Sequence, residues 1–168
     1  MPPDPQEDLF VALYPRLREL AAAQLRTHGR TLQPTALVHE AWLRLRNQAR
    51  NGFRDESHFL AVAAVVIRHV VIDHARTKAR RKRGGGAMVL ALDDDVAAVG
   101  TDPAQLLELE EALQELARLD DRKAKVVELR VFGGATIEET AKCLGISHMT
   151  VTSDWRMARA WLATRFRR

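Results

Sequence analysis

The sequence predicts an all-α protein made of two small helical domains joined by a flexible acidic linker. Aromatic residues make up only 5% of the chain, with one Tyr, which leaves little material for a β-sandwich or β-barrel core. Ala, Leu, Glu and Arg, which favour helices, are common throughout. The run Gly84-Gly85-Gly86 marks a domain boundary. We therefore expect one domain over residues 8–83, the linker over 84–103 and the second domain over 104–168.

The spacing of apolar residues predicts two amphipathic helices at the start of the first domain. The first runs from Asp8 to about Thr27, with its apolar face formed by Leu9, Leu13, Leu17, Leu20 and Leu25. The second runs from Ala36 to about Gln48, with Thr35 as its N-cap and a buried face formed by Leu37, Ala41 and Leu45.

A third helix is predicted from His58, capped by Ser57, to about Arg80. Its first half is apolar, but the run Phe59–Ile72 is interrupted by charge and is shorter than the ~20 residues of a membrane span, so no membrane association is expected. Its last part carries six cations in eight residues, more than a helix dipole requires. We interpret this basic end as a phosphate-binding surface.

In the second domain, Asp102 and Pro103 have the chemistry of a helix start. The helix that follows has its apolar face at Leu106, Leu109, Leu113 and Leu116, and a further helix is expected from Arg122 to about Phe132, ending at Gly133-Gly134.

The C-terminal segment has the pattern of a helix-turn-helix. Thr136 and Glu139 are spaced as a capping box, Gly145 is suited to a left-handed helix stop, and Ser147 can cap a second helix two residues later. Polar and basic side chains crowd the first turns of that second helix, where a recognition helix meets base edges. We expect Trp155, Trp161 and Leu162 to face the core.

Basic residues are concentrated in two separate segments. Residues 1–83 carry 15 basic and 8 acidic side chains (+7), and residues 146–168 carry 5 and 1 (+4). The segments between them are acidic, at −4 for 84–103 and −3 for 104–145. This distribution suggests two contacts with a polyanion, each gaining affinity from phosphate neutralisation.

No enzyme, metal site or cofactor is predicted. Cys143 is the single cysteine, so neither an intrachain disulfide nor a cysteine-based zinc site is expected. His39-Glu40 begins like a zinc-protease motif, but residue 43 is Leu where a second His is needed. The N-terminal residues do not have the pattern of a signal peptide, and we expect a cytoplasmic protein.

The whole chain resembles the extracytoplasmic-function (ECF) class of sigma factors, in a divergent ECF-like branch. The segment 136–162, TIEETAKCLGISHMTVTSDWRMARAWL, resembles the helix-turn-helix of sigma region 4. The segment 36–45, ALVHEAWLRL, resembles the region 2 helix that grips the β′ clamp helices of RNA polymerase. The segment 72–76, IDHAR, with the basic run after it, resembles the end of the region 2 helix that meets the −10 element.

The resemblance implies three sets of site residues. The −35 element would be read by Ser147, His148, Met149, Thr150, Thr152, Ser153, Arg156 and Arg159. The −10 element would contact Phe53, Arg54, His58, Arg68, His69, Asp73, Arg76 and Arg80. The polymerase β′ subunit would contact Leu37, His39, Glu40, Leu43 and Arg44.

By this resemblance the chain is a sigma factor that binds core RNA polymerase, recognises promoter DNA at the −35 and −10 elements, and aids promoter melting. Region 2 (8–83) would dock on β′ and capture a base flipped from the stack. Region 4 (104–168) would rest on the β flap. An anti-sigma factor is a further partner that the resemblance suggests.

Two other functions fit parts of the sequence. A free-standing helix-turn-helix repressor or activator would bind specific DNA alone, as a symmetric dimer. An adaptor would bind a protein partner through its leucine-rich helices and show little salt-dependent DNA binding. Neither alternative needs the polymerase-docking segment 36–45.

Overall fold

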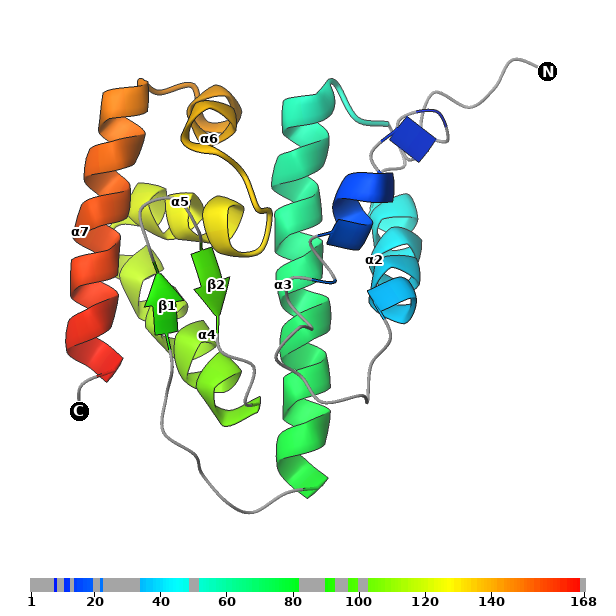
Figure 1. Ribbon diagram of the computed structural model, residues 1–168, viewed down its shortest axis with the longest axis horizontal. Coiled ribbons are helices and arrows are strands. Elements are labelled where there is room, and N and C mark those ends of the chain that lie inside the picture. The colour runs from blue at the N-terminus through cyan, green and yellow to red at the C-terminus, as the bar shows by residue number, and fades with distance from the viewer. Residues whose placement is uncertain are drawn as a thin grey trace.

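The structure is a computed structural model, and it describes residues 8, 11–12, 14–19, 22, 34–48, 52–81, 90–92, 97–99 and 103–166. Figure 1 shows helices on both sides of one long central helix, α3. All described residues between 8 and 22 are helical, in agreement with the predicted first helix, and Leu17 is buried. Its other predicted apolar positions, Leu9, Leu13, Leu20 and Leu25, lie outside the described residues.

The next two helices, α2 (Pro34–Gln48) and α3 (Glu56–Arg81), form where the sequence predicts them, with different starts. Since α2 begins at Pro34, Thr35 lies inside its first turn, and the prediction of Thr35 as the N-cap was wrong. The N-cap of α3 is Asp55 in place of Ser57: its Oδ1 accepts a hydrogen bond from the backbone N–H of His58 at 2.8 Å.

The second half of the chain forms four helices: α4 (Pro103–Leu119), α5 (Asp121–Val131), α6 (Ile137–Leu144) and α7 (His148–Phe166). The predicted apolar positions of α4 are buried, and α5 begins after Asp120, whose side chain accepts from Lys123 N–H. α6 and α7 are joined by a tight turn at Gly145, which has a left-handed backbone (φ 65°) that glycine adopts without a steric penalty. The helix-turn-helix prediction is confirmed.

A short hairpin interrupts the helices. β1 (Leu90–Leu92) pairs antiparallel with β2 (Ala97–Val99), with Leu90 opposite Val99, and β2 contacts α5. The sequence predicted a linker without strands here, and that detail was wrong because strands of three residues are too short to show a periodic pattern. The glycine run at 84–86 and the acidic run at 93–95 lie outside the described residues. Apart from this hairpin, all regular structure among the described residues is helical, which confirms the all-α fold class.

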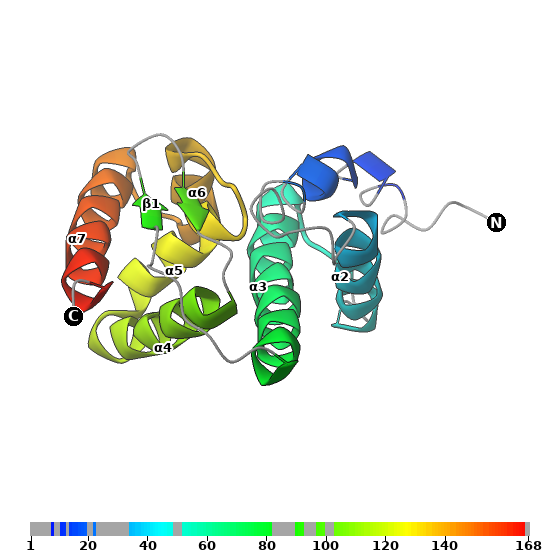
Figure 2. The ribbon, with the colours of Figure 1, turned by 60° about the horizontal axis from the view of Figure 1, so that its bottom comes forward.

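Helix α3 organises the fold because other helices pack on several of its sides. α2 covers one side, and α4, α5 and α6 cover another, as both ribbon views show (Figures 1 and 2). One cluster of buried apolar residues runs from α2 through α3 into α4, α5, α6 and α7. A smaller cluster joins Leu60 and Ala64 of α3 to Leu129 and Ala135. The segments expected to form two domains therefore share a core in this structure.

Helix α3 is long and apolar enough to cross a membrane by length and composition alone. In the fold, however, its apolar side chains form the centre of the core, including Phe59, Val66, Ile67 and Val70, each exposed by 2% or less. Such burial is typical of a core helix.

The N-terminus of α6 is held both locally and by a distant residue. The Thr136 hydroxyl accepts from Glu139 N–H at 3.1 Å, and the Glu139 carboxylate accepts from Thr136 N–H at 2.8 Å, which completes the predicted capping box. The same carboxylate receives two hydrogen bonds from the Arg16 guanidinium, at 2.5 and 2.7 Å. These bonds from Arg16, together with the Thr136 N–H, lower the pKa of Glu139 to about 2.

We predict that Glu139→Gln lowers the free energy of unfolding by up to about 1 kcal/mol at neutral pH. Because the folded pKa of Glu139 lies below its ordinary value of 4.5, this contribution is fully present above pH 4.5 and is lost as the pH falls towards 2. Urea unfolding of both proteins from pH 7 to pH 3 should show a constant difference down to about pH 4.5 and a shrinking one below it. Glu138→Gln, in the same helical turn but exposed, is the control. A difference that does not depend on pH would contradict this role of the Glu139 charge.

Candidate nucleic-acid interface

The predicted recognition helix α7 has one buried and one open face. Val151, Trp155 and Leu162 lie against the core and are exposed by 1% or less. With 3.6 residues per turn, Met149, Ser153 and Arg156 fall within about 60° of one another on the opposite face. All three are exposed, and Met149 is 83% exposed. The outer face of α7 therefore presents an apolar, a hydroxyl and a cationic side chain in one line.

The remaining predicted −35 residues flank this line at the start of α7 and along it. Ser147 caps the helix, because its Oγ accepts from Thr150 N–H at 3.1 Å and lies 2.8 Å from the Thr150 hydroxyl. His148 is exposed, while the Thr152 hydroxyl donates to the His148 carbonyl at 2.9 Å. The guanidinium of Arg159 lies 5.9 Å from the centre of the Trp155 ring. Seven of the eight predicted residues thus lie between Ser147 and Arg156, in and around the first turns of α7, and Arg159 follows about one turn further along.

The orientation of α7 depends on residues that the sequence analysis did not select. Asp154 is 3% exposed and receives hydrogen bonds from Arg122 of α5 at 2.6 and 3.2 Å, with Lys123 Nζ at 3.7 Å. Arg130 of α5 stacks over the Trp155 ring at 4.8 Å. These contacts fix the rotation of α7 about its axis, and hence which side chains point outward. Asp154 is the single acidic residue among residues 146–168, a signal that could have identified it.

Five of the predicted −10 residues form a stripe along α3. By helical geometry they lie within about 60° of one another and extend over about 33 Å of the helix: His58, His69, Asp73, Arg76 and Arg80. His58 is half-buried and the other four are exposed. We call these five residues the α3 stripe.

Arg68 does not belong to this stripe, although it was predicted with it. It lies about 100° around the helix from the centre of the stripe, on the side that faces α4 and α5. Its Nε and Nη2 donate to Glu110 at 2.7 and 3.0 Å, and its Nη1 donates to Glu128 at 2.9 Å. We call these three residues the Arg68 cluster. In this structure the hydrogen-bond donors of Arg68 are therefore used by the carboxylates of Glu110 and Glu128.

The loop before α3 holds the last two predicted −10 residues. Phe53 is half-buried and packs edge-on against Phe59 and His58, with ring centres 4.9 and 5.9 Å apart. Arg54 is exposed, and its backbone N–H donates to His58 Nδ1 at 3.2 Å. These contacts attach the loop to the first turn of α3, beside one end of the α3 stripe.

The predicted polymerase-binding residues of α2 divide into an outer and an inner group. His39, Glu40 and Leu43 are exposed and lie within about 100° of one another. Leu37 is 1% exposed and packs in the core, so its side chain is not at the surface here. Arg44 is half-exposed and pairs with Glu40 at 2.8 Å and with Asp73 at 2.9 Å. Arg44 therefore connects the outer face of α2 to the α3 stripe, because Asp73 is also 3.6 Å from Arg76.

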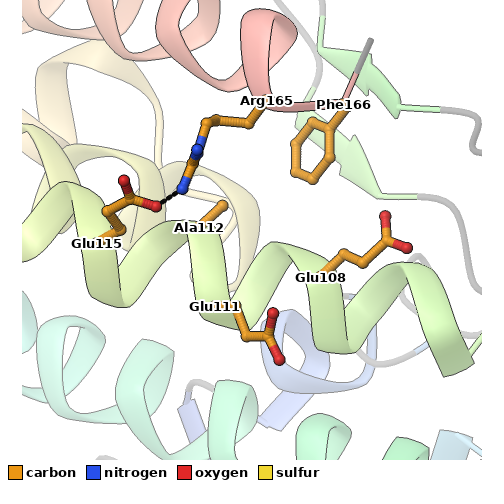
Figure 3. A pocket seen from close by; sticks show the side chains of 6 residues that line it. All are labelled: Glu108, Glu111, Ala112, Glu115, Arg165 and Phe166. Atoms are coloured by element: carbon orange, nitrogen blue, oxygen red, sulfur yellow. Dashed lines mark ion pairs between the residues drawn. The ribbon is translucent and has the colours of Figure 1, made fainter. Parts of the chain in front are cut away.

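A cavity of about 320 Å³ lies between α4 and the end of α7 (Figure 3). Glu108, Glu111 and Glu115 line it with Phe166 and Arg165, and Arg165 is paired with Glu115. The carboxylates make this cavity unsuited to phosphate groups. Among the described residues, no group of three or more His, Cys, Asp or Glu side chains could hold a metal ion.

Comparison with known proteins identifies the family. A family model described as ECF sigma factor matches residues 3–168, which is nearly the whole chain. No curated protein and no solved structure matches the chain. The family consists of transcription initiation factors and not of enzymes. The chain therefore belongs to the ECF sigma factor family and acts in transcription initiation, with RNA polymerase and DNA as its partners.

Proposed function

We propose that this sigma factor divides promoter recognition between two surfaces and binds core polymerase through others. The outer face of α7 reads the −35 element, and the α3 stripe with the loop 52–55 contacts the −10 element and supports strand opening. The outer face of α2 docks on the β′ clamp helices, while the second half of the chain rests on the β flap. The cytoplasm is where we expect these contacts to form.

The observation that carries this proposal is the line of Met149, Ser153 and Arg156 on the helix-turn-helix. A recognition helix reads bases with the side chains of its first turns, and an arginine there can donate two hydrogen bonds to a guanine. The exposed methionine, an apolar side chain at the same face, suits contact with a thymine methyl group. The buried contacts of Asp154 and Trp155 support the proposal because they present this line rigidly.

The α3 stripe supports the second part of the proposal. It combines the exposed cations Arg76 and Arg80 with the imidazoles of His58 and His69, and the half-buried aromatic Phe53 of the loop 52–55 packs against His58 at one end of it. Unstacking a base costs a few kcal/mol, which cationic contacts to the backbone and a stacking partner can offset. Binding of an anti-sigma factor to this protein stays a prediction.

The deciding experiment is transcription with purified sigma-free core polymerase, this protein, and sheared DNA from its own source, followed by mapping of RNA start sites. We expect new starts that share two upstream motifs about one and a half to two DNA turns apart. If no start appears while the protein alone still binds specific DNA, the repressor or activator function replaces this proposal.

Arg156→Ala should weaken transcription from a −35-dependent promoter by about 5- to 150-fold, the range for loss of one base-specific arginine contact (about 1–3 kcal/mol). Binding to core polymerase, measured by titration of labelled protein, should stay within twofold of the wild type. Arg118→Ala removes the same charge from an exposed position on α4 and is the control. An equal loss in both assays would show that Arg156 does not act in −35 recognition.

The double substitution Glu40→Ala and Leu43→Ala should weaken polymerase binding and leave −35 recognition intact. We expect at least a tenfold loss of affinity for core polymerase, because it removes a charged and an apolar contact from one exposed face of α2. Binding of the free protein to −35 DNA should be unchanged. Glu108→Ala, an exposed glutamate on α4, is the control. Unchanged polymerase affinity would mean that α2 docks through another face.

A further inference from the structure

The first turns of α7 use most of their own hydroxyl groups. The Ser147 Oγ accepts from Thr150 N–H at 3.1 Å and lies 2.8 Å from the Thr150 hydroxyl. The Thr152 hydroxyl donates to the His148 carbonyl at 2.9 Å. Since a hydroxyl has one proton to donate, the proton of Thr152 is taken, and so is one of the two protons in the pair formed by Ser147 and Thr150. These residues shape the start of the helix and have few donors left for bases.

Met149 lies among these residues but has a different chemistry. Its side chain is 83% exposed, on the line that it forms with Ser153 and Arg156, and Figure 1 shows α7 along an outer edge of the molecule. A thioether is a weak acceptor and has no donor. Among the groups that base pairs present in the major groove, the apolar one is the C5-methyl group of thymine. Met149 can therefore distinguish bases by the presence of a methyl group, and not by a pattern of donors and acceptors.

Position separates Met149 from Met157, another exposed methionine of α7. Single exposed apolar side chains are ordinary on protein surfaces, so exposure alone assigns no role. Met157 is 57% exposed but lies about 12 Å further along the helix and about 80° around it. A recognition helix meets base edges with its N-terminal residues. Met149 is the second residue of α7 and is in that position, whereas Met157 is not.

The distance between Met149 and Arg156 predicts how far apart the bases that they read are. Both lie on the outer face of α7, about 10.5 Å apart along the helix axis. Successive base pairs of DNA are about 3.4 Å apart. The pyrimidine whose methyl group contacts Met149 should therefore lie about three base pairs from the guanine that accepts from Arg156.

We infer that Met149 senses the C5-methyl group of one pyrimidine in the −35 element, so that thymine and 5-methylcytosine bind more tightly there than uracil and cytosine. The inference rests on the proposed function of α7. Thymine and 5-methylcytosine carry the same methyl group and differ in the neighbouring exocyclic group. Burying one methyl-sized apolar group strengthens binding by about 3- to 5-fold. The protein would then respond to methylation of a promoter cytosine as well as to base sequence.

The test measures binding of the holoenzyme, reconstituted from core polymerase and the full chain, to duplexes of a promoter found by start-site mapping. Each thymine of the −35 element, on either strand, is replaced in turn by deoxyuridine, which lacks the methyl group and keeps the same base pairing. We expect one position at which deoxyuridine weakens binding by about 3- to 5-fold. At that position, 5-methylcytosine paired with guanine should bind about 3- to 5-fold more tightly than cytosine.

Substitutions of methionine test which residue makes the contact. Met149→Gln keeps the length of the side chain and removes its apolar end, so it should abolish both differences, whereas Met149→Leu should retain them. Met157→Gln is the matched control and should respond like the wild type. No response of the wild type to deoxyuridine at any thymine, or a response that persists in Met149→Gln, would overturn the inference. A response to deoxyuridine without one to 5-methylcytosine would overturn the methyl group as the recognised feature.

The failure of the proposed function can be recognised separately. If holoenzyme binding does not require the −35 motif, or if Arg156→Ala leaves it unchanged, α7 does not read that element and both proposals fail. If binding requires the motif and Arg156, but no thymine responds to loss of its methyl group, −35 reading by α7 stands and only the role of Met149 is overturned.

Discussion

The burial of α3 is the constraint on which the rest of the structure depends. Ten of its 26 residues are buried, and they are distributed around much more than one face. A single partner helix covers only a stripe, so α2 alone would leave part of this apolar surface exposed. The helices of the second half of the chain provide the remaining cover, and Arg68, a cation that faces them, is paired with two carboxylates. The helix at the centre of the core is therefore also the helix that carries the α3 stripe.

This arrangement gives different faces of α3 different tasks. The α3 stripe stays open to solvent, the face towards α2 builds the core, and the face with Ala64 and Arg68 receives the second half of the chain. Small side chains allow close approach on that last face, as the short distance from Gly133 to Ala64 shows. That face also carries Leu60, which packs with Ala64, Leu129 and Ala135 in the smaller apolar cluster, so apolar burial and the hydrogen bonds of Arg68 hold the second half of the chain together.

Much of the fold and part of the site followed from the sequence because local chemistry decides them. The capping box at Thr136 and Glu139, the turn at Gly145 and the cap at Ser147 involve residues only a few positions apart, so their spacing is visible in the chain. Caps were misassigned at Thr35 and Ser57, where several polar residues compete to cap the same start. The partners of Arg68, Arg16 and Asp154 could not be predicted because they are 32 or more positions away, and one sequence shows no long-range pairing. The burial of Leu37 agrees with the buried face predicted for α2, whereas its predicted contact with β′ came from the resemblance alone.

The division of α7 into a buried and an exposed face has a consequence for how the DNA preference of such a protein changes over generations. Val151, Trp155 and Leu162 hold the helix against the core, whereas Met149, Ser153 and Arg156 are exposed. Substitutions at exposed positions usually change the free energy of unfolding by less than about 0.5 kcal/mol. The three outer residues can therefore be exchanged without unfolding the helix-turn-helix, so that DNA preference and stability can change independently.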